Sequence, residues 1–193
     1  MPATFHYCED NGAATGSPVH GTTRSGFPSD THYATDMNWK TADDCTANGG
    51  TTYSSAPITV PGSGSNYSMP KYQYGHFIGG TFNQISSAKW SAHTGDTGSF
   101  PTGITLKGTV TSTYATPATS NSSFGTDFTS QVAIGSGISV NFATSGPENA
   151  SPASTLSADG YTQYLASQLV VASTCTTPGD TPTITATLQY NEN

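Results

Sequence analysis

The sequence predicts an all-β protein: an antiparallel β-sandwich, immunoglobulin-like or jelly-roll, with an extended irregular N-terminal arm. Serine contributes 25 and threonine 33 of the 193 residues, while charged residues make up only 9% of the chain. Typical soluble domains carry about 25% charged residues, and helical bundles need more Leu, Glu, Lys and Arg than are present here. Apolar residues recur at every second position in several segments, which is the periodicity of a half-buried strand.

Residues 1–57 form the predicted arm because they cannot build a core of their own. Val19 is the only Val, Leu or Ile in this stretch, which also holds six of the twelve acidic residues of the chain. Turn-forming pairs such as Asn11-Gly12 interrupt it repeatedly. Such a segment gains order only by packing on its own domain or on a neighbouring subunit. Deletion of residues 1–50 is therefore expected to leave a foldable sandwich and to weaken assembly.

Residues 58–193 carry the predicted β-sandwich domain. Alternating apolar residues predict strands at 104–110, 138–142, 165–171 and 184–190. Ser or Thr occupies many of the outward positions, and Gly108 lies at an inward position of the first strand. Less regular apolar stretches predict further strands at 57–60, 71–79, 80–86, 87–92 and 126–134. The Thr-Pro-Gly-Asp turn at 177–180 is expected to join the last two long strands into a hairpin.

The composition also indicates which partners the protein lacks. The chain has five basic residues, and Arg24 is its only arginine, so it cannot present the basic face that binds nucleic acid. The longest aliphatic run, at 169–172, is far shorter than the ~20 residues of a membrane helix. Neither a basic nor an apolar stretch follows Met1, so we expect no signal peptide. We expect no nucleic-acid partner and no membrane partner.

Motifs of common catalytic and cofactor sites are missing from the sequence. It contains no GK[ST] loop, no H-E-x-x-H and no G-x-S-x-G. The two G-x-G segments, at 62–64 and 135–137, lack the third glycine and the helix of a dinucleotide site, so we interpret them as turns. We therefore expect no enzyme activity, no catalytic residue and no cofactor.

Three cysteines, Cys8, Cys45 and Cys175, raise the question of a disulfide. Cys8 and Cys45 are the expected pair because their disulfide would close a long loop and fasten an arm that has little core. It would require an oxidising compartment. The alternative is three unpaired thiols that are buried or half-buried.

A zinc site is a second interpretation of the same region. On a strand, His6 and Cys8 would share one face, which is a spacing that metal sites use. Cys45 would be the third ligand, and His20 or His32 the fourth. No C-x-x-C pair accompanies these residues, so we assign no metal site.

Acidic residues at 9–12 and 43–44 could bind calcium. Neither segment follows the D-x-[DN]-x-[DN]-G pattern of a calcium loop. We therefore interpret both as turns.

Aromatic residues are densest between positions 67 and 82. The members are Tyr67, Tyr72, Tyr74, His76, Phe77 and Phe82. Tyr72 and Tyr74 could stack on sugars, which would make the protein a glycan-binding module. The simpler interpretation is a core strand in which tyrosine hydroxyls reach the surface.

Several segments resemble virion structural proteins of tailed phages. They are KYQYGHFIGGTFNQIS at 71–86, TYATP at 113–117, YLxxQLVV at 164–171, PGD at 178–180 and LQYNE at 188–192. The resemblance covers roughly residues 58–193 and implies an antiparallel sandwich on the capsid surface or tail. It carries no catalytic residues, and residues 1–57 have no counterpart in it.

We therefore expect a non-enzymatic structural protein of a virus particle, either a phage capsid decoration protein or a tail or fibre component. Its partners would be other virion proteins, namely major capsid or tail proteins, and further copies of itself in a homo-oligomer. It would reside in the virion after assembly in the host cytoplasm. Ser- and Thr-rich outer faces suit this role because they favour strands without forming apolar patches. The alternatives are the glycan-binding module and a subunit of an extracellular filament that exchanges strands through its arm.

Overall fold

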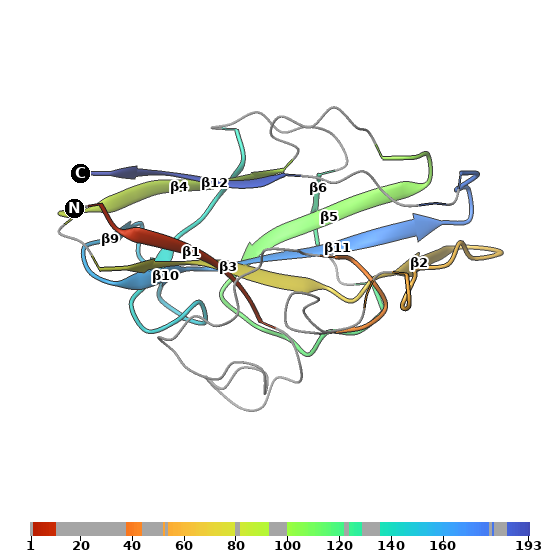
Figure 1. Ribbon diagram of the computed structural model, residues 1–193, viewed down its shortest axis with the longest axis horizontal. Coiled ribbons are helices and arrows are strands. Elements are labelled where there is room, and N and C mark those ends of the chain that lie inside the picture. Colours follow the sequence, from red (N-terminus) through yellow and green to blue (C-terminus); the bar gives the residue numbers. More distant parts are fainter. Residues whose placement is uncertain are drawn as a thin grey trace.

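The computed structural model describes residues 2–10, 38–43, 52, 54–79, 82–92, 100–121, 124–128, 136–177, 179 and 185–193. These residues form antiparallel sheets that pack into a sandwich, as Figure 1 shows. The prediction of an all-β antiparallel sandwich is therefore confirmed. Both termini lie at the same end of the molecule, where the Ala3 amide donates a 3.0 Å hydrogen bond to Glu192 Oε1.

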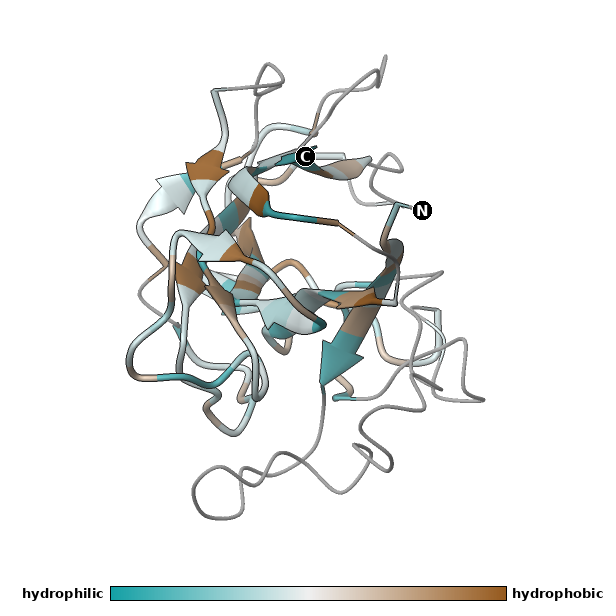
Figure 2. Cartoon of the chain, turned by 90° about the vertical axis from the view of Figure 1, so that its left-hand side faces the viewer, coloured by the Kyte–Doolittle hydropathy of each residue, from teal (hydrophilic) through white to brown (hydrophobic). Residues whose placement is uncertain are grey.

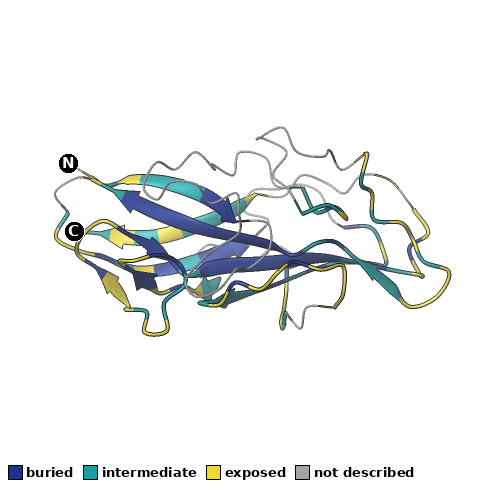
Figure 3. Cartoon of the chain, turned by 90° about the horizontal axis from the view of Figure 1, so that it is seen from below, coloured by how far each residue is buried: buried dark blue, intermediate teal, exposed yellow. Residues whose placement is uncertain are grey.

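The larger sheet has eight strands in the order β6-β5-β11-β3-β10-β8, with β1 beside β3 and β2 beside β11. Its strands are β1 (Thr4–Asp10), β2 (Ser65–Tyr67), β3 (Lys71–Ile78), β5 (Ile104–Thr111), β6 (Thr126–Asp127), β8 (Phe142–Ala143), β10 (Gly160–Thr162) and β11 (Tyr164–Ala172). The long strands β3 and β11 are buried along nearly their whole length (Figure 3). They are buried because polypeptide covers both faces of this sheet.

The smaller sheet has the order β12-β4-β7, with β9 beside β4. Its strands are β4 (Ile85–Ala92), β7 (Ile138–Ser139), β9 (Thr155–Leu156) and β12 (Ala186–Glu192). The register between β4 and β12 shifts between Gln189 and Asn191, and Ser87 in the same stretch has a left-handed φ of 55°. This irregularity is a β-bulge, which increases the local twist of the sheet.

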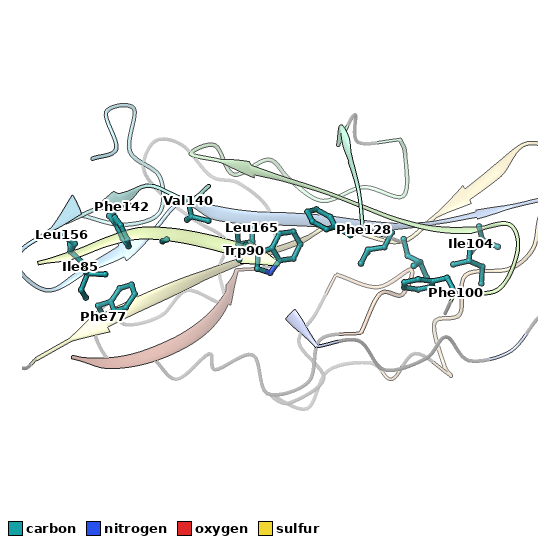
Figure 4. Close-up of a cluster of buried hydrophobic side chains, with 14 of the residues drawn as sticks. Phe77, Ile85, Trp90, Phe100, Ile104, Phe128, Val140, Phe142, Leu156 and Leu165 are labelled. Atoms are coloured by element: carbon teal, nitrogen blue, oxygen red, sulfur yellow. The ribbon is translucent and has the colours of Figure 1, made fainter. Parts of the chain in front are cut away.

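The main core lies between the two sheets (Figure 4). Phe77 and Leu165 of the larger sheet meet Ile85 and Trp90 of the smaller one, and all four are at most 1% exposed. Gly108 lies on the inward face of β5, as its position predicted. A Cβ atom at Gly108 would lie 2.8 Å from the ring of Phe128. The rings of Trp90 and Phe128 meet edge to face there, with their centroids 4.6 Å apart.

Residues 4–10 belong to the sandwich, although the sequence placed them in an arm outside it. β1 pairs with β3 along its whole length, from Thr4 opposite Ile78 to Asp10 opposite Tyr72. In Figure 2 this strand changes from hydrophobic to hydrophilic toward its end. The sequence of β1 does not alternate between apolar and polar residues near its end. Both faces of the strand are covered there, so that Cys8, Glu9 and Asp10 are all buried. The start of the sandwich therefore does not coincide with the boundary expected after residue 57.

Most long strands match the predicted segments. The segments 71–79, 87–92, 104–110, 165–171 and 184–190 correspond to β3, β4, β5, β11 and β12. The segment 57–60 is not a strand. Of 80–86, residues 85–86 belong to β4, residues 82–84 are in no strand, and 80–81 lie outside the described residues. Of 126–134, residues 126–127 form β6, and 129–134 lie outside the described residues.

Two connections differ from the prediction because the chain crosses between the sheets. The segment 138–142 divides into β7, which pairs with β4, and β8, which pairs with β10. The predicted hairpin at 177–180 is wrong, because β11 lies in the larger sheet whereas β12 pairs with β4. Turn residues favour a reversal of the chain, but the next strand can still join the opposite sheet.

Candidate functional site

Two adjacent acidic residues at the end of β1 are buried and point to opposite faces of the larger sheet. Glu9 points toward the smaller sheet, and its Oε1 accepts a 3.0 Å hydrogen bond from Lys71 Nζ. Asp10 points to the outer face, and its Oδ2 accepts a 2.6 Å hydrogen bond from the Tyr164 hydroxyl. β1 is thereby attached to β3 on one face of the sheet and to β11 on the other. The sequence interpreted Glu9 and Asp10 as part of a turn, and the structure corrects that interpretation.

The Glu9–Lys71 pair is shielded from solvent, since each side chain is only 1% exposed. Burial raises the pKa of the Glu9 carboxyl above its usual value, although the charge and hydrogen bond of Lys71 act in the opposite direction. Within the described part of the chain, Glu9 Oε2 and the Oε1 of Gln73, which lies opposite Glu9, are buried without a hydrogen-bond partner. Burying two charges costs several kcal/mol per ion, about as much as their attraction returns.

Residues 38–43 pack against the part of the larger sheet that contains Lys71. Trp39 Nε1 donates a 3.2 Å hydrogen bond to Ser167 Oγ, and Ser167 lies opposite Lys71 in the sheet. The Lys40 carbonyl accepts a 2.8 Å hydrogen bond from the Met69 amide. Lys40 and Asp43 both act electrostatically on Glu9. This segment therefore packs on the sheet near the ion pair, and two of its charged residues act on Glu9.

The outer face of the larger sheet carries a second buried cluster that is rich in tyrosine. The Tyr164 ring lies edge-on to Tyr72 and Tyr74, at centroid distances of 5.6 and 5.7 Å. Tyr114 covers Tyr72 at 4.8 Å, and the Tyr114 amide donates a 2.9 Å hydrogen bond to Glu148 Oε1. Burial raises the pKa of Tyr72 and of Tyr114. The cluster is a compact aromatic layer around the carboxylate of Asp10.

Tyr72 and Tyr74, the predicted glycan-stacking residues, belong to this layer. They are only 5% and 4% exposed, so neither presents an open ring face to a sugar. The structure gives no support to sugar stacking at these two positions.

The residues of the predicted disulfide and zinc site are described only in part. Cys8 is buried on β1, whereas Cys45 lies outside the described residues, so the Cys8–Cys45 disulfide stays a prediction. His6 and Cys8 share a face, and His6 lies opposite His76, whose ring stacks on Tyr161 at 4.0 Å. Among the described residues no three His, Cys, Asp or Glu side chains gather as a metal site would require.

Sequence reasoning missed Lys71 and Tyr164 as members of the site. The signal that could have identified Lys71 is its charge. It is the only Lys, Arg, Asp or Glu in the predicted strand at 71–79. No comparable signal marked Tyr164, because ten tyrosines are present and the sequence does not show which one reaches a carboxylate.

Comparison of the chain with models of protein families, with curated proteins and with solved structures finds no match. The described residues include no helix long and apolar enough to cross a membrane. The function is therefore inferred from the residues and their geometry.

Proposed function

We propose that the protein is a non-enzymatic structural component of a virus particle, either a phage capsid decoration protein or a tail or fibre component. It acts by binding its neighbours. The observation that supports this most is an interior held by many buried polar contacts, combined with a polar outer face that lacks large apolar patches. Particle proteins need a fixed shape for packing, and large apolar surface patches would make free subunits aggregate before assembly.

Polar contacts between segments that are far apart in the sequence hold the interior in place. Besides the Glu9–Lys71 and Asp10–Tyr164 contacts, Gln168 Nε2 donates 2.9 Å hydrogen bonds to the carbonyls of Ser68 and Ser120. Ser68 Oγ also accepts a 3.0 Å hydrogen bond from the Leu169 amide. These buried contacts specify one arrangement of the chain, because any alternative packing would leave the same groups without partners.

The outer face of the smaller sheet is polar and able to form hydrogen bonds, and it carries the charged Lys89 opposite Gln189. Leu188 and Tyr190 of β12 pack on the core, while Gln189 and Asn191 between and beyond them are exposed. Among the described residues Val60, at 36%, is the only exposed large hydrophobic side chain. A surface of this kind stays soluble and still offers many donors and acceptors to a neighbouring subunit.

Three of the five segments that resemble tailed-phage virion proteins fall on strands, whereas 113–117 lies in none. The 71–86 segment spans β3 and the start of β4, and the 164–171 and 188–192 segments lie within β11 and β12. The resemblance thus concerns the framework of the sandwich. By this proposal the partners are major capsid or tail proteins and further copies of the chain, and the protein resides in the virion after assembly in the host cytoplasm.

The filament alternative gains no support from β1. Strand exchange between subunits would need a strand that leaves its own domain, whereas β1 pairs with β3 of the same chain.

Peptide mass spectrometry of purified particles tests the proposal. Particles are separated on a density gradient and washed at high salt, and a non-structural protein of the same infected cells serves as the control. The chain should remain in a fixed ratio to the major particle proteins while the control is lost. Loss of the chain together with the control would contradict a structural role.

A further inference from the structure

We propose that Lys71 and Glu9 condense into an amide bond that joins β1 covalently to β3. The reacting groups are the Lys71 amine and the Glu9 carboxyl, which already touch at 3.0 Å in the interior of the sandwich. The product would close a loop between residues that are 62 positions apart. This modification is independent of the proposed role in a virus particle.

Burial withholds water from the pair and favours the neutral acid form of Glu9. Because each side chain is 1% exposed, water stabilises neither charge, and moving one proton from the amine to the carboxylate yields a neutral amine and a neutral acid. Burial raises the pKa of Glu9, which acts in the same direction. A neutral amine has the lone pair needed for attack, and a neutral acid is the better electrophile.

The sheet register supplies the proximity. Glu9 lies opposite Gln73 on β3, so Glu9 and Lys71 occupy one face of two paired strands and cannot drift apart while the sheet is intact. Fixed contacts of this kind raise effective concentrations to about 10⁵ M or more. The pair is therefore held ready to react for the lifetime of the folded protein.

The reaction balances without any further reagent. The Lys71 Nζ lone pair attacks Glu9 Cδ, a C–N bond forms and one C–O bond breaks. The departing oxygen leaves as water with two protons that originate from the ammonium group. One proton passes directly from the ammonium group to the carboxylate oxygen across the 3.0 Å hydrogen bond, and the second follows when water departs. Condensation removes both buried charges and also one carboxyl oxygen.

An exposed ion pair of the same chain provides a matched control. Lys107 Nζ lies 3.4 Å from Asp127 Oδ2, but the two side chains are 34% and 54% exposed. Water stabilises both charges there, so this pair should stay ionic.

Mass spectrometry of the purified full chain tests the proposal. After reduction of thiols and denaturation, the intact mass should be one water molecule below the sequence mass, with removal of Met1 taken into account. A tryptic digest should contain residues 2–24 joined to 41–89, because trypsin does not cleave after an amidated lysine. The Lys71→Arg variant keeps a positive charge but has no reactive amine, so it should show the full mass. The Lys107→Arg variant should lose water as the parent does.

Three results would overturn the amide. They are a parent protein of full mass, a tryptic cleavage after Lys71 in all molecules, or a loss of water that maps to another residue. Protein that has never folded, because it is kept in denaturant from synthesis onward, should have the full mass. The same protein should lose one water molecule after it is refolded. If Lys71→Arg does not fold, the tryptic map of the parent protein decides alone.

Discussion

Tyr164 and Asp10, which are 154 positions apart in the sequence, are joined by a 2.6 Å hydrogen bond within the outer aromatic layer of the larger sheet. The bond links the first strand of the sandwich to its long central strand β11. Glu9, the neighbour of Asp10, is linked to β3 on the opposite face. The end of β1 is thus held from both sides.

Replacing Tyr164 by Phe should lower the free energy of unfolding by about 1.5–3 kcal/mol, because a hydrogen bond to a buried carboxylate is lost and the carboxylate stays buried. Urea unfolding measures the change. Tyr67→Phe is the control, since the Tyr67 hydroxyl makes no hydrogen bond with the described residues, and it should change stability by less than about 0.5 kcal/mol. Equal effects of the two variants would contradict the importance of the Asp10 contact.

Gly137→Ala should destabilise the sandwich by about 1–3 kcal/mol, the usual effect of overpacking. A Cβ atom at Gly137 would overlap the Trp90 carbonyl oxygen and lie 2.5 Å from Ser91 Oγ, and backbone cannot move away as a side chain can. Gly62→Ala is the matched control because a Cβ atom there meets nothing within 4 Å. Thermal unfolding of both variants gives the comparison. A Gly137→Ala protein as stable as the Gly62→Ala protein would show that β7 does not approach β4 so closely.

Stability should fall steeply as pH rises above about 10. Burial raises the pKa of Tyr7, Tyr72 and Tyr114 above the usual value of 10.0, so the folded protein holds these protons where the unfolded chain loses them. The unfolded state then binds fewer protons, and stability falls by up to about 1.4 kcal/mol per pH unit for each such tyrosine. Urea unfolding at several pH values measures the slope, and Tyr114→Phe should reduce it by one proton. A slope that is flat above pH 10 would contradict the burial of these phenols.

Deletion of residues 2–10 should prevent stable folding, contrary to the expectation that the sequence alone gives for the whole segment 1–50. The deletion removes β1 and leaves Lys71 buried without its carboxylate, which typically costs about 3–5 kcal/mol. That amount approaches the total stability of many domains. Circular dichroism and hydrogen exchange of the truncated protein measure the outcome. A truncated protein that unfolds as cooperatively as the parent would show that β1 is dispensable.

The sequence predicts the strands that have one face in the core and one in solvent. β5 alternates buried and half-exposed residues from Ile104 onward, and its position was predicted almost to the residue. β1 was missed because its end is buried on both faces, so no two-residue pattern of polarity survives there. The sheet that a strand joins was predicted less well, because turn residues specify a reversal and not a partner.

The candidate site depends on register, which a single sequence does not show. Glu9 and Lys71 meet because β1 pairs with β3 so that Glu9 faces Gln73. A shift of one residue would turn Glu9 to the outer face and Asp10 to the core. The sequence contains both acids and the lysine, but only the pairing of the strands brings them into contact.

The central claim is the structural role in a virus particle, and a cryo-electron microscopy reconstruction of native particles tests it most directly. The account predicts repeated density on the capsid or tail into which the two-sheet sandwich fits, with β1 paired to β3 of the same copy. Complete reconstructions of capsid and tail in which every density is assigned to other proteins would contradict it.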